Sequence, residues 1–258
     1  MNGAFIIASK DLRNIFVSPL FYVVSGICSL IWFLLFSSRL ADFIFQSSMQ
    51  MMQSQGRESG GLPVHFYVIF PHLSMVNLIM IFAVSAFTMR LFTEEKRNRT
   101  FDLLLTAPVT STEIVIGKLI AGVGTAWALL AIAALYPVSL AFFGAMDWGP
   151  FASSLLGLAL LSAAYVAVGI FASSLTQSAV VAVVLALVFN VMLWFVGVLA
   201  DRSSDATERT IIEHLNVGEH LQNFMKGNVS LSGVVFMLSL VFLFTFLTRQ
   251  VVESARWR

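Results

Sequence analysis

Long apolar stretches alternate with short polar segments along the whole chain. A helix needs about 20 apolar residues to cross a bilayer, and six stretches reach that length, roughly at 19–38, 71–91, 113–143, 151–173, 178–200 and 229–248. Residues 149–200 carry no charge. At about 1.5 Å per residue this run is too long for one crossing, so the polar residues 173–178 predict a turn between two helices. The pattern predicts an all-α integral membrane protein with six transmembrane helices.

Lys and Arg residues are unevenly distributed among the polar segments. If the N-terminus lies inside, the inner segments hold ten Lys and Arg residues and the outer segments hold five. Cytoplasmic loops of membrane proteins carry an excess of Lys and Arg. Both termini are therefore predicted to be cytoplasmic.

The N-terminal residues 1–18 place apolar side chains at helical spacing. Phe5, Ala8, Leu12 and Phe16 share one helical face, which predicts a helix lying in the inner interface. A cytoplasmic tail without a fixed surface role is the alternative.

Two longer segments are predicted on the outer side. Residues 40–70 are rich in Ser, Gln, Met and Gly, which predicts a partly mobile connection. Residues 201–228 carry spaced apolar residues among charges, which predicts short amphipathic helices at the outer surface before the sixth span; a solvated loop is the alternative. These apolar residues are Ile211, Ile212, Leu215, Leu221, Phe224 and Met225.

The composition argues against several classes of function. The chain is 58% hydrophobic and 11% charged, against about 25% charged in soluble domains. The net charge of +1 does not indicate nucleic-acid binding. No charged residue is expected deep inside a span, which argues against a proton-coupled transporter with its own relay. The polar groups at depth are predicted to form hydrogen bonds between helices, with substrate contact as the alternative; they are Asn77, Tyr136, Tyr165 and Asn190.

Sequence motifs for catalysis, metals or nucleotides do not emerge. The four histidines follow no HExxH pattern, and no GxSxG motif is present. Gly117-Lys118 fails the P-loop pattern because Thr112 and Leu119 occupy the positions that need Gly and Ser or Thr. The chain is therefore expected to be no enzyme and to bind no cofactor itself.

A charged segment, residues 93–112, interrupts the apolar stretches after the second predicted span. Thr100 can cap a short helix, Phe101, Leu104 and Leu105 then share an apolar face, and Pro108 stops the helix. An apolar face on a helix outside the membrane needs a groove to fill. The alternative is a helix that lies passively on membrane lipids.

The string EEKRNRTFDLLLTAPVTSTEIVIGK, residues 94–118, resembles the signature of ABC-2 type transporter permeases. In that family an acidic helix end leads to a T-x-x-x-L-L-x-x-P coupling helix, and the next membrane helix begins E-I-V-x-G-K. The end of the chain, from EHLQNFMKGNVSLSG onwards, is similar to the gliding-motility-associated, GldF-like branch.

The resemblance implies a single permease domain over 1–258 in the bacterial inner membrane. It implies a separate ABC ATPase subunit that binds ATP and Mg, a second permease copy, identical or related, and a possible GldG-like partner with an extracytoplasmic domain. Acidic and basic candidates for salt bridges or gating are Glu94, Glu95 and Arg97. The residues implied to contact the ATPase are Thr100, Phe101, Asp102, Leu103, Leu104, Leu105, Thr106 and Pro108.

Three functions remain open at this point. The first is export of a lipid-linked, polysaccharide or peptide substrate. The second is a mechanotransmitting subunit that drives an extracytoplasmic partner without moving a substrate. The third, an assembly factor without an ATPase, fits the signature least. Because few polar groups line the spans, a lipidic substrate or pure force transmission fits better than a hydrophilic channel.

Overall fold

The computed structural model describes residues 2–53, 62–144, 146–200 and 214–256, and these residues form helices and connections without a strand. Five of the described helices are long and apolar enough to cross a membrane: Pro19–Gln53, His65–Arg97, Ser111–Phe143, Trp148–Leu175 and Leu231–Arg256. The fifth predicted span corresponds to the apolar helix α8 (Ala179–Ala200), whose side chains are described from Ala179 to Phe195.

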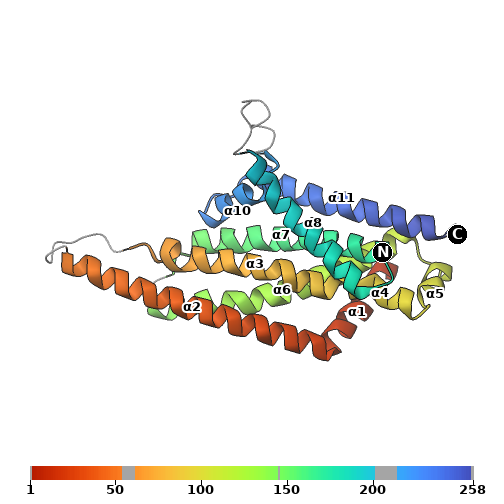
Figure 1. Ribbon diagram of the computed structural model, residues 1–258, viewed down its shortest axis with the longest axis horizontal. Helices are drawn as coiled ribbons and strands as arrows, with labels where there is room; N and C mark the ends of the chain where they lie inside the picture. The colour runs from red at the N-terminus through yellow and green to blue at the C-terminus, as the bar shows by residue number, and fades with distance from the viewer. Residues whose placement is uncertain (1, 54–61, 145, 201–213, 257–258) are drawn as a thin grey trace.

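The helices form an elongated bundle in which α7 (Trp148–Leu175) is central. It packs against α3 (Phe70–Thr88), α6 (Ser111–Val138), α8 and α11 (Leu231–Arg256). The predicted turn is present, since the chain leaves helical geometry at Thr176 before α8 begins. Both termini lie at one end of the bundle (Figure 1). We call this the α5 end, after the short helix α5 (Phe101–Thr106) that lies there.

The first long helix, α2 (Pro19–Gln53), is longer than predicted. It continues through residues 40–53, for which a mobile connection was expected, and after residues 54–61 the chain is again helical from His65, as a π-helical turn, η1 (His65–Ile69). The expectation was wrong there because residues 40–53 contain no Gly or Pro to stop the helix. At 35 residues, α2 spans about 52 Å.

The N-terminal helix α1 (Asn2–Val17) packs alongside α6. The close approach depends on Gly117, because a Cβ atom there would lie 2.7 Å from the Ala4 carbonyl oxygen. The predicted helix is present; Ile7 and Ala8 are buried, whereas Phe5 is 71% exposed. The α6 surface, not the spacing of the aromatic residues, selects the buried side.

The short helix α10 (Val217–Met225) is one of the helices expected before the last span. Residues 201–213, which include Ile211 and Ile212, lie outside the described residues. Its buried side packs against the bundle, and its last carbonyl groups accept hydrogen bonds from side chains. Ser153 donates to the Phe224 carbonyl at 2.7 Å, and the His65 ring lies 2.7 Å from the Met225 carbonyl.

The polar residues at depth join helices, as predicted. The Tyr136 hydroxyl on α6 lies 2.6 Å from Ser29 Oγ on α2. The Asn190 amide on α8 donates to Ser85 Oγ on α3 at 3.4 Å. Each bond replaces a contact with water that the bilayer core cannot supply.

Candidate functional site

The short helix α5 (Phe101–Thr106) lies at the α5 end, between α4 (Arg90–Arg97) and α6. It begins at Phe101, directly after Thr100, and ends where Ala107 turns to extended geometry, just before Pro108. Thr100 is the N-cap residue, but its hydroxyl makes no capping bond and instead donates to the Glu95 carbonyl at 3.3 Å. The predicted capping role of Thr100 was therefore wrong.

The turn between α4 and α5 depends on a left-handed residue. Arg99 has φ +57°, and it is the one non-glycine residue with positive φ in the described chain. The Thr100 amide donates to the Glu95 carbonyl at 2.9 Å, which is the long bond that closes a helix C-terminus in the Schellman arrangement. Glycine usually occupies this position because it lacks a Cβ atom. Arg99 therefore adopts a backbone conformation that is unfavourable for a residue with a side chain.

The side chains of α5 divide between the bundle and the solvent. Phe101 is only 7% exposed: its ring meets Phe92 of α4 edge-on at 6.0 Å, and Lys96 Nζ lies 5.5 Å from its centroid. Leu104 is partly buried against the core. Leu103 is 69% exposed, and Asp102 and Thr106 are exposed beside it.

The outward face of α5 therefore differs from the expected one. Phe101 and Leu104 were expected to contact a partner, but both turn toward the bundle, because Phe92 and the core offer them an apolar surface within the same chain. Leu103 takes the outward position. The side chain of Leu105 lies outside the described part of the chain.

The connection from α5 to α6 is fixed at both ends. Thr110 caps α6: its hydroxyl accepts a bond from the Glu113 amide at 3.2 Å, while Glu113 Oε2 accepts one from the Thr110 amide at 2.9 Å. This reciprocal pair is a capping box. Arg256, near the end of α11, donates to the Val109 carbonyl at 2.7 Å. The base of α5 is thus held against two long helices.

A buried ion-pair cluster lies behind α5 and joins three helices. Lys118 of α6 is 1% exposed, and its ammonium group lies 3.1 Å from Asp11 Oδ2 of α1 and 2.8 Å from Glu95 Oε2 of α4. The contact with Glu95 is ionic and lacks the geometry of a hydrogen bond. Lys118 also donates to the Leu91 carbonyl at 2.5 Å.

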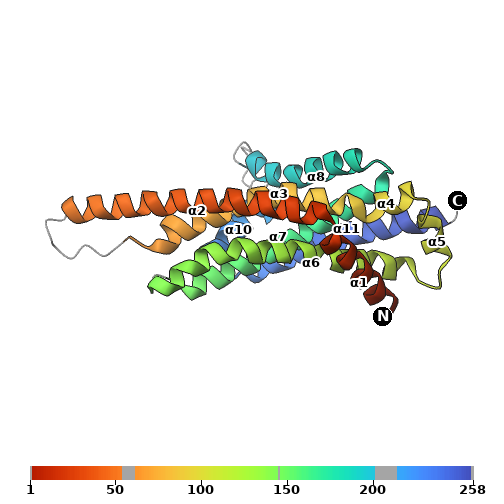
Figure 2. The same ribbon diagram turned by 90° about the horizontal axis from the view of Figure 1, so that it is seen from below.

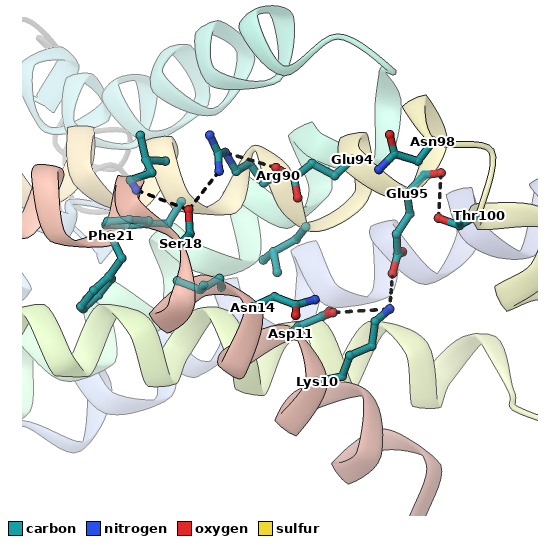
Figure 3. A pocket seen from close by; sticks show the side chains of 14 residues that line it. Lys10, Asp11, Asn14, Ser18, Phe21, Arg90, Glu94, Glu95, Asn98 and Thr100 are labelled. Carbon is teal, nitrogen blue, oxygen red and sulfur yellow. Dashed lines mark hydrogen bonds and ion pairs between the residues drawn. The ribbon is translucent and has the colours of Figure 1, made fainter.

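Lys10 of α1 completes this cluster from the solvent side. Its Nζ atom lies 3.3 Å from Glu95 Oε1 and 3.9 Å from Asp11 Oδ1 (Figure 3). Two ammonium groups thus face two carboxylates, so the formal charge of the cluster is zero. Removing one member of a buried ion pair leaves a charge uncompensated, which costs about 3–5 kcal/mol.

The remaining acidic and basic candidates lie around the cluster. Glu94 points away from it and pairs with Arg90 at 3.3 Å, one helical turn earlier. Arg90 also donates to Ser18 Oγ at 3.4 Å, at the junction of α1 and α2. Arg97 is exposed at the end of α4. The structure therefore separates Glu94 and Glu95, since only Glu95 contacts α1 and α6.

Two pockets flank this region. The first, of about 340 Å³, lies between α1 and α4 and is lined by residues that include Lys10, Asp11, Arg90, Glu94 and Glu95 (Figure 3). The second, of about 870 Å³, lies beside α5 and is mainly basic: Lys96, Arg97, Arg99, Phe101, Asp102, Gln177 and Ala255 line it. Among the described residues no group of three potential metal ligands occurs.

The junction of α3 and α4 contains an inserted side chain. Ser173 of α7 donates to the Met89 carbonyl at 2.8 Å and accepts from the Phe92 amide at 3.1 Å. Lys96 donates to the neighbouring Ser174 carbonyl. A side chain that enters the backbone hydrogen bonds of a helix is a recognised cause of a kink. These bonds also join α4 to α7, in addition to its contact with the cluster.

Lys10, Asp11 and Lys118 were not predicted as site residues. Lys118 is one of the ten Lys and Arg residues of the inner segments, and no charge was expected deep in a span. The available signal was the position of Lys118, which follows four apolar or small residues, 114–117, within a long apolar helix. An ionisable residue in such a helix usually has a partner and a function.

Comparison with protein families matches residues 5–226 to the family described as ABC-2 family transporter protein. A comparison with curated proteins gives no match. The matched region contains α1, α5, the ion-pair cluster and α10. Membership implies a multi-pass membrane subunit that works with a separate ABC ATPase, usually as a dimer. This chain belongs to the ABC-2 family and is a permease subunit of an ABC transporter, not its nucleotide-binding ATPase.

Proposed function

We propose that this permease couples ATP hydrolysis by a separate ATPase subunit to the export of a substrate across the bacterial inner membrane. The observation that carries the proposal is the exposed face of α5, where Leu103 lies between the polar residues Asp102 and Thr106. A single exposed apolar side chain on a firmly held helix suits insertion into a cleft of another protein. In this proposal α5 is the coupling helix.

The α5 end faces the cytoplasm in this proposal. The basic residues Lys96, Arg97 and Arg99 lie there together with both termini, in agreement with the excess of Lys and Arg on the cytoplasmic side of membrane proteins. With α8 as a further crossing, the chain spans the membrane six times. The ATPase binds ATP and Mg, and two permease copies, identical or related, form the transmembrane part.

Movement of α5 would reach the membrane helices through α4. Phe101 contacts Phe92 of α4. Glu95 of α4 pairs with Lys118 of α6, and Lys118 in turn pairs with α1. A force on α5 is therefore shared by α1, α4 and α6. Because interfaces of packed side chains hold a few discrete arrangements rather than deforming continuously, we expect these helices to move as one unit.

A mechanotransmitting function is the second candidate, and the length of α2 favours it. The hydrocarbon core is about 30 Å thick, whereas the 35 residues of α2 extend about 52 Å. If Pro19 lies near the inner face, the helix projects well beyond the outer face. There it could contact an extracytoplasmic, GldG-like partner.

The proposal is tested by placing a charge on the outward face of α5. Leu103→Asp should abolish copurification of the ATPase or its stimulation by the permease, because a carboxylate cannot enter an apolar cleft without losing its hydration. Gln250→Asp, an exposed position near the end of α11, is the matched control. The Leu103 variant should keep the elution profile and melting temperature of the parent chain.

Unchanged association and turnover in the Leu103→Asp variant would contradict the proposal. Export and mechanotransmission are separated by reconstituting the complex in liposomes with candidate lipids and peptides. ATP-dependent movement of one of them supports export, and turnover without movement of any of them supports transmission to an outer partner.

A further inference from the structure

A third pocket, remote from α5, lies between α3, α8 and α10. Its volume is about 390 Å³, within the range of about 300–1,000 Å³ found for ligand sites. It follows α3 from Phe70 to Ile81, a distance of about 17 Å along the helix axis. None of the described residues that line it is charged. These properties suit a long, uncharged, apolar ligand.

The wall of this pocket is fixed by a hydrogen-bond relay. Trp194 Nε1 of α8 donates to the Tyr165 hydroxyl of α7 at 2.6 Å, and Tyr165 donates to Asn77 Oδ1 of α3 at 3.1 Å. An indole nitrogen can only donate, so the Tyr165 oxygen accepts there, and the Tyr165 hydroxyl in turn donates to the carbonyl oxygen of Asn77.

The same reasoning orients the other half of the Asn77 amide. With Oδ1 held by Tyr165, the Nδ2 group has no hydrogen-bond partner among the described residues, although Asn77 is only 4% exposed and lines the pocket. Asn77 Nδ2 is not one of the fully buried atoms without a partner, so it can be reached from the pocket, and an amide donor without a partner is costly in an apolar environment. A ligand with a neutral oxygen acceptor would satisfy it.

We propose that the α3–α8–α10 pocket binds the acyl chain of an amphiphile, with the ester or amide carbonyl at the head of the chain accepting a hydrogen bond from Asn77 Nδ2. The binding itself does not need ATP; only the further step, that the bound molecule is the exported one, rests on the proposed function. The acyl chain can belong to a membrane phospholipid or to a single-chain molecule, and the two share this chemistry.

The rim of the pocket indicates how such a ligand enters. Leu78 of α3 and Phe195 of α8 line it and are 50% and 62% exposed. Both belong to long apolar helices, so the opening is bounded by apolar side chains that suit hydrocarbon and not water. Gln222 of α10 is the exposed polar residue at the rim, where a polar head group would remain.

The experiment uses the full permease complex in phospholipid nanodiscs without nucleotide. The probe is a fatty acid methyl ester with a diazirine at the chain end, and labelled peptides are mapped by mass spectrometry after illumination. Val191→Trp fills the pocket from α8, whereas Val188→Trp adds the same bulk to an exposed position one turn earlier, outside the pocket.

We expect labelling of α3 and α10 in the parent chain and in Val188→Trp, and at least a fivefold loss in Val191→Trp. A matching diazirine alkane without the carbonyl should label less, and Asn77→Leu should remove this preference of about fivefold, the size expected for one neutral hydrogen bond. A diacyl phospholipid probe with the same diazirine chain shows which source fills the pocket more strongly.

Equal labelling of these peptides in Val191→Trp and the parent chain would overturn the proposal, because the probe would then report only bulk lipid around the helices. A preference for the ester over the alkane that survives Asn77→Leu would overturn the role of the amide. Since neither result involves the ATPase, either could occur while α5 still couples to it, and the proposed function would stand.

Discussion

Lys118 Nζ on α6 lies 3.1 Å from Asp11 Oδ2 on α1, and the lysine side chain is almost completely buried. The pair joins the N-terminal helix to a long apolar helix across 107 residues of sequence. Glu95 brings α4 to the same ammonium group. These three helices are therefore tied together at one buried charge.

The first prediction concerns this charge. Lys118→Met should destabilise the chain by about 3–5 kcal/mol, because the carboxylates of Asp11 and Glu95 lose their buried partner. Lys10→Met should cost no more than about 1 kcal/mol, since the Lys10 side chain is 57% exposed and its ion pairs are screened by water. Denaturant or thermal unfolding of the purified variants measures both effects.

A double variant distinguishes lost charge pairing from lost packing. Lys118→Met combined with Asp11→Leu should recover part of the stability, because an apolar pair of similar volume can replace a buried ion pair. Equal losses in Lys118→Met and Lys10→Met would show that the cluster does not depend on the buried lysine.

The second prediction concerns the contact between α3 and α7. A Cβ atom at Gly169 would lie 2.1 Å from Thr88 Oγ1, so Gly169→Ala should force α3 and α7 apart and cost about 1–3 kcal/mol. Gly26→Ala is the control, because a Cβ atom there meets nothing within 4 Å; it should be neutral or stabilising by up to about 1 kcal/mol. Melting temperatures in one detergent compare the two, and a lower value for Gly26→Ala than for Gly169→Ala would refute the close packing.

The third prediction separates the two apolar faces of α5. Phe101→Ala should cost about 3 kcal/mol through the loss of its contacts with Phe92 and Lys96. Leu103→Ala should leave stability nearly unchanged, because its side chain is mostly exposed. Limited proteolysis of the α4–α6 connection reports on this region directly. Faster cleavage in the Leu103 variant than in the Phe101 variant would reverse the assignment of the faces.

The fourth prediction concerns Arg99, whose backbone is left-handed. Arg99→Gly should stabilise the turn by about 1 kcal/mol, since glycine adopts this conformation without a steric cost. If the Arg99 side chain serves ATPase binding, the same variant should weaken association while raising the melting temperature. Arg99→Ala removes the charge but keeps the backbone cost, so it should weaken association without the gain in stability. A lower melting temperature for Arg99→Gly than for the parent would contradict the backbone argument.

Local sequence signals predicted the elements better than their orientations. Pro108 and the apolar run before it fixed the place of α5, and the lack of charge over 149–200 fixed two helices with a turn between them. The outward side of α5 was not predictable in this way. Phe101 and Leu103 are both apolar, and only the position of Phe92, nine residues earlier in sequence, decides which of them is buried.

The ion-pair cluster could not be predicted from any single segment of the sequence. Asp11, Glu95 and Lys118 belong to three separate helices, and each alone resembles an ordinary charged residue near a membrane surface. Their meeting depends on the close packing of α1 on Gly117, which allows Asp11 to reach Lys118. The extension of α2 to Gln53 was missed for the opposite reason, since a polar composition was interpreted as mobility although no residue there stops a helix.

The central claim is that α5 delivers the force of an ATPase to the cluster behind it. The most direct measurement places a photoreactive amino acid at position 103 in the assembled complex, with position 250 as the control, and identifies the crosslinked product by mass spectrometry. We expect a crosslink to the ATPase subunit from position 103 and none from position 250. Crosslinks from position 103 only to lipid or to a second permease copy, while the ATPase copurifies, would contradict it.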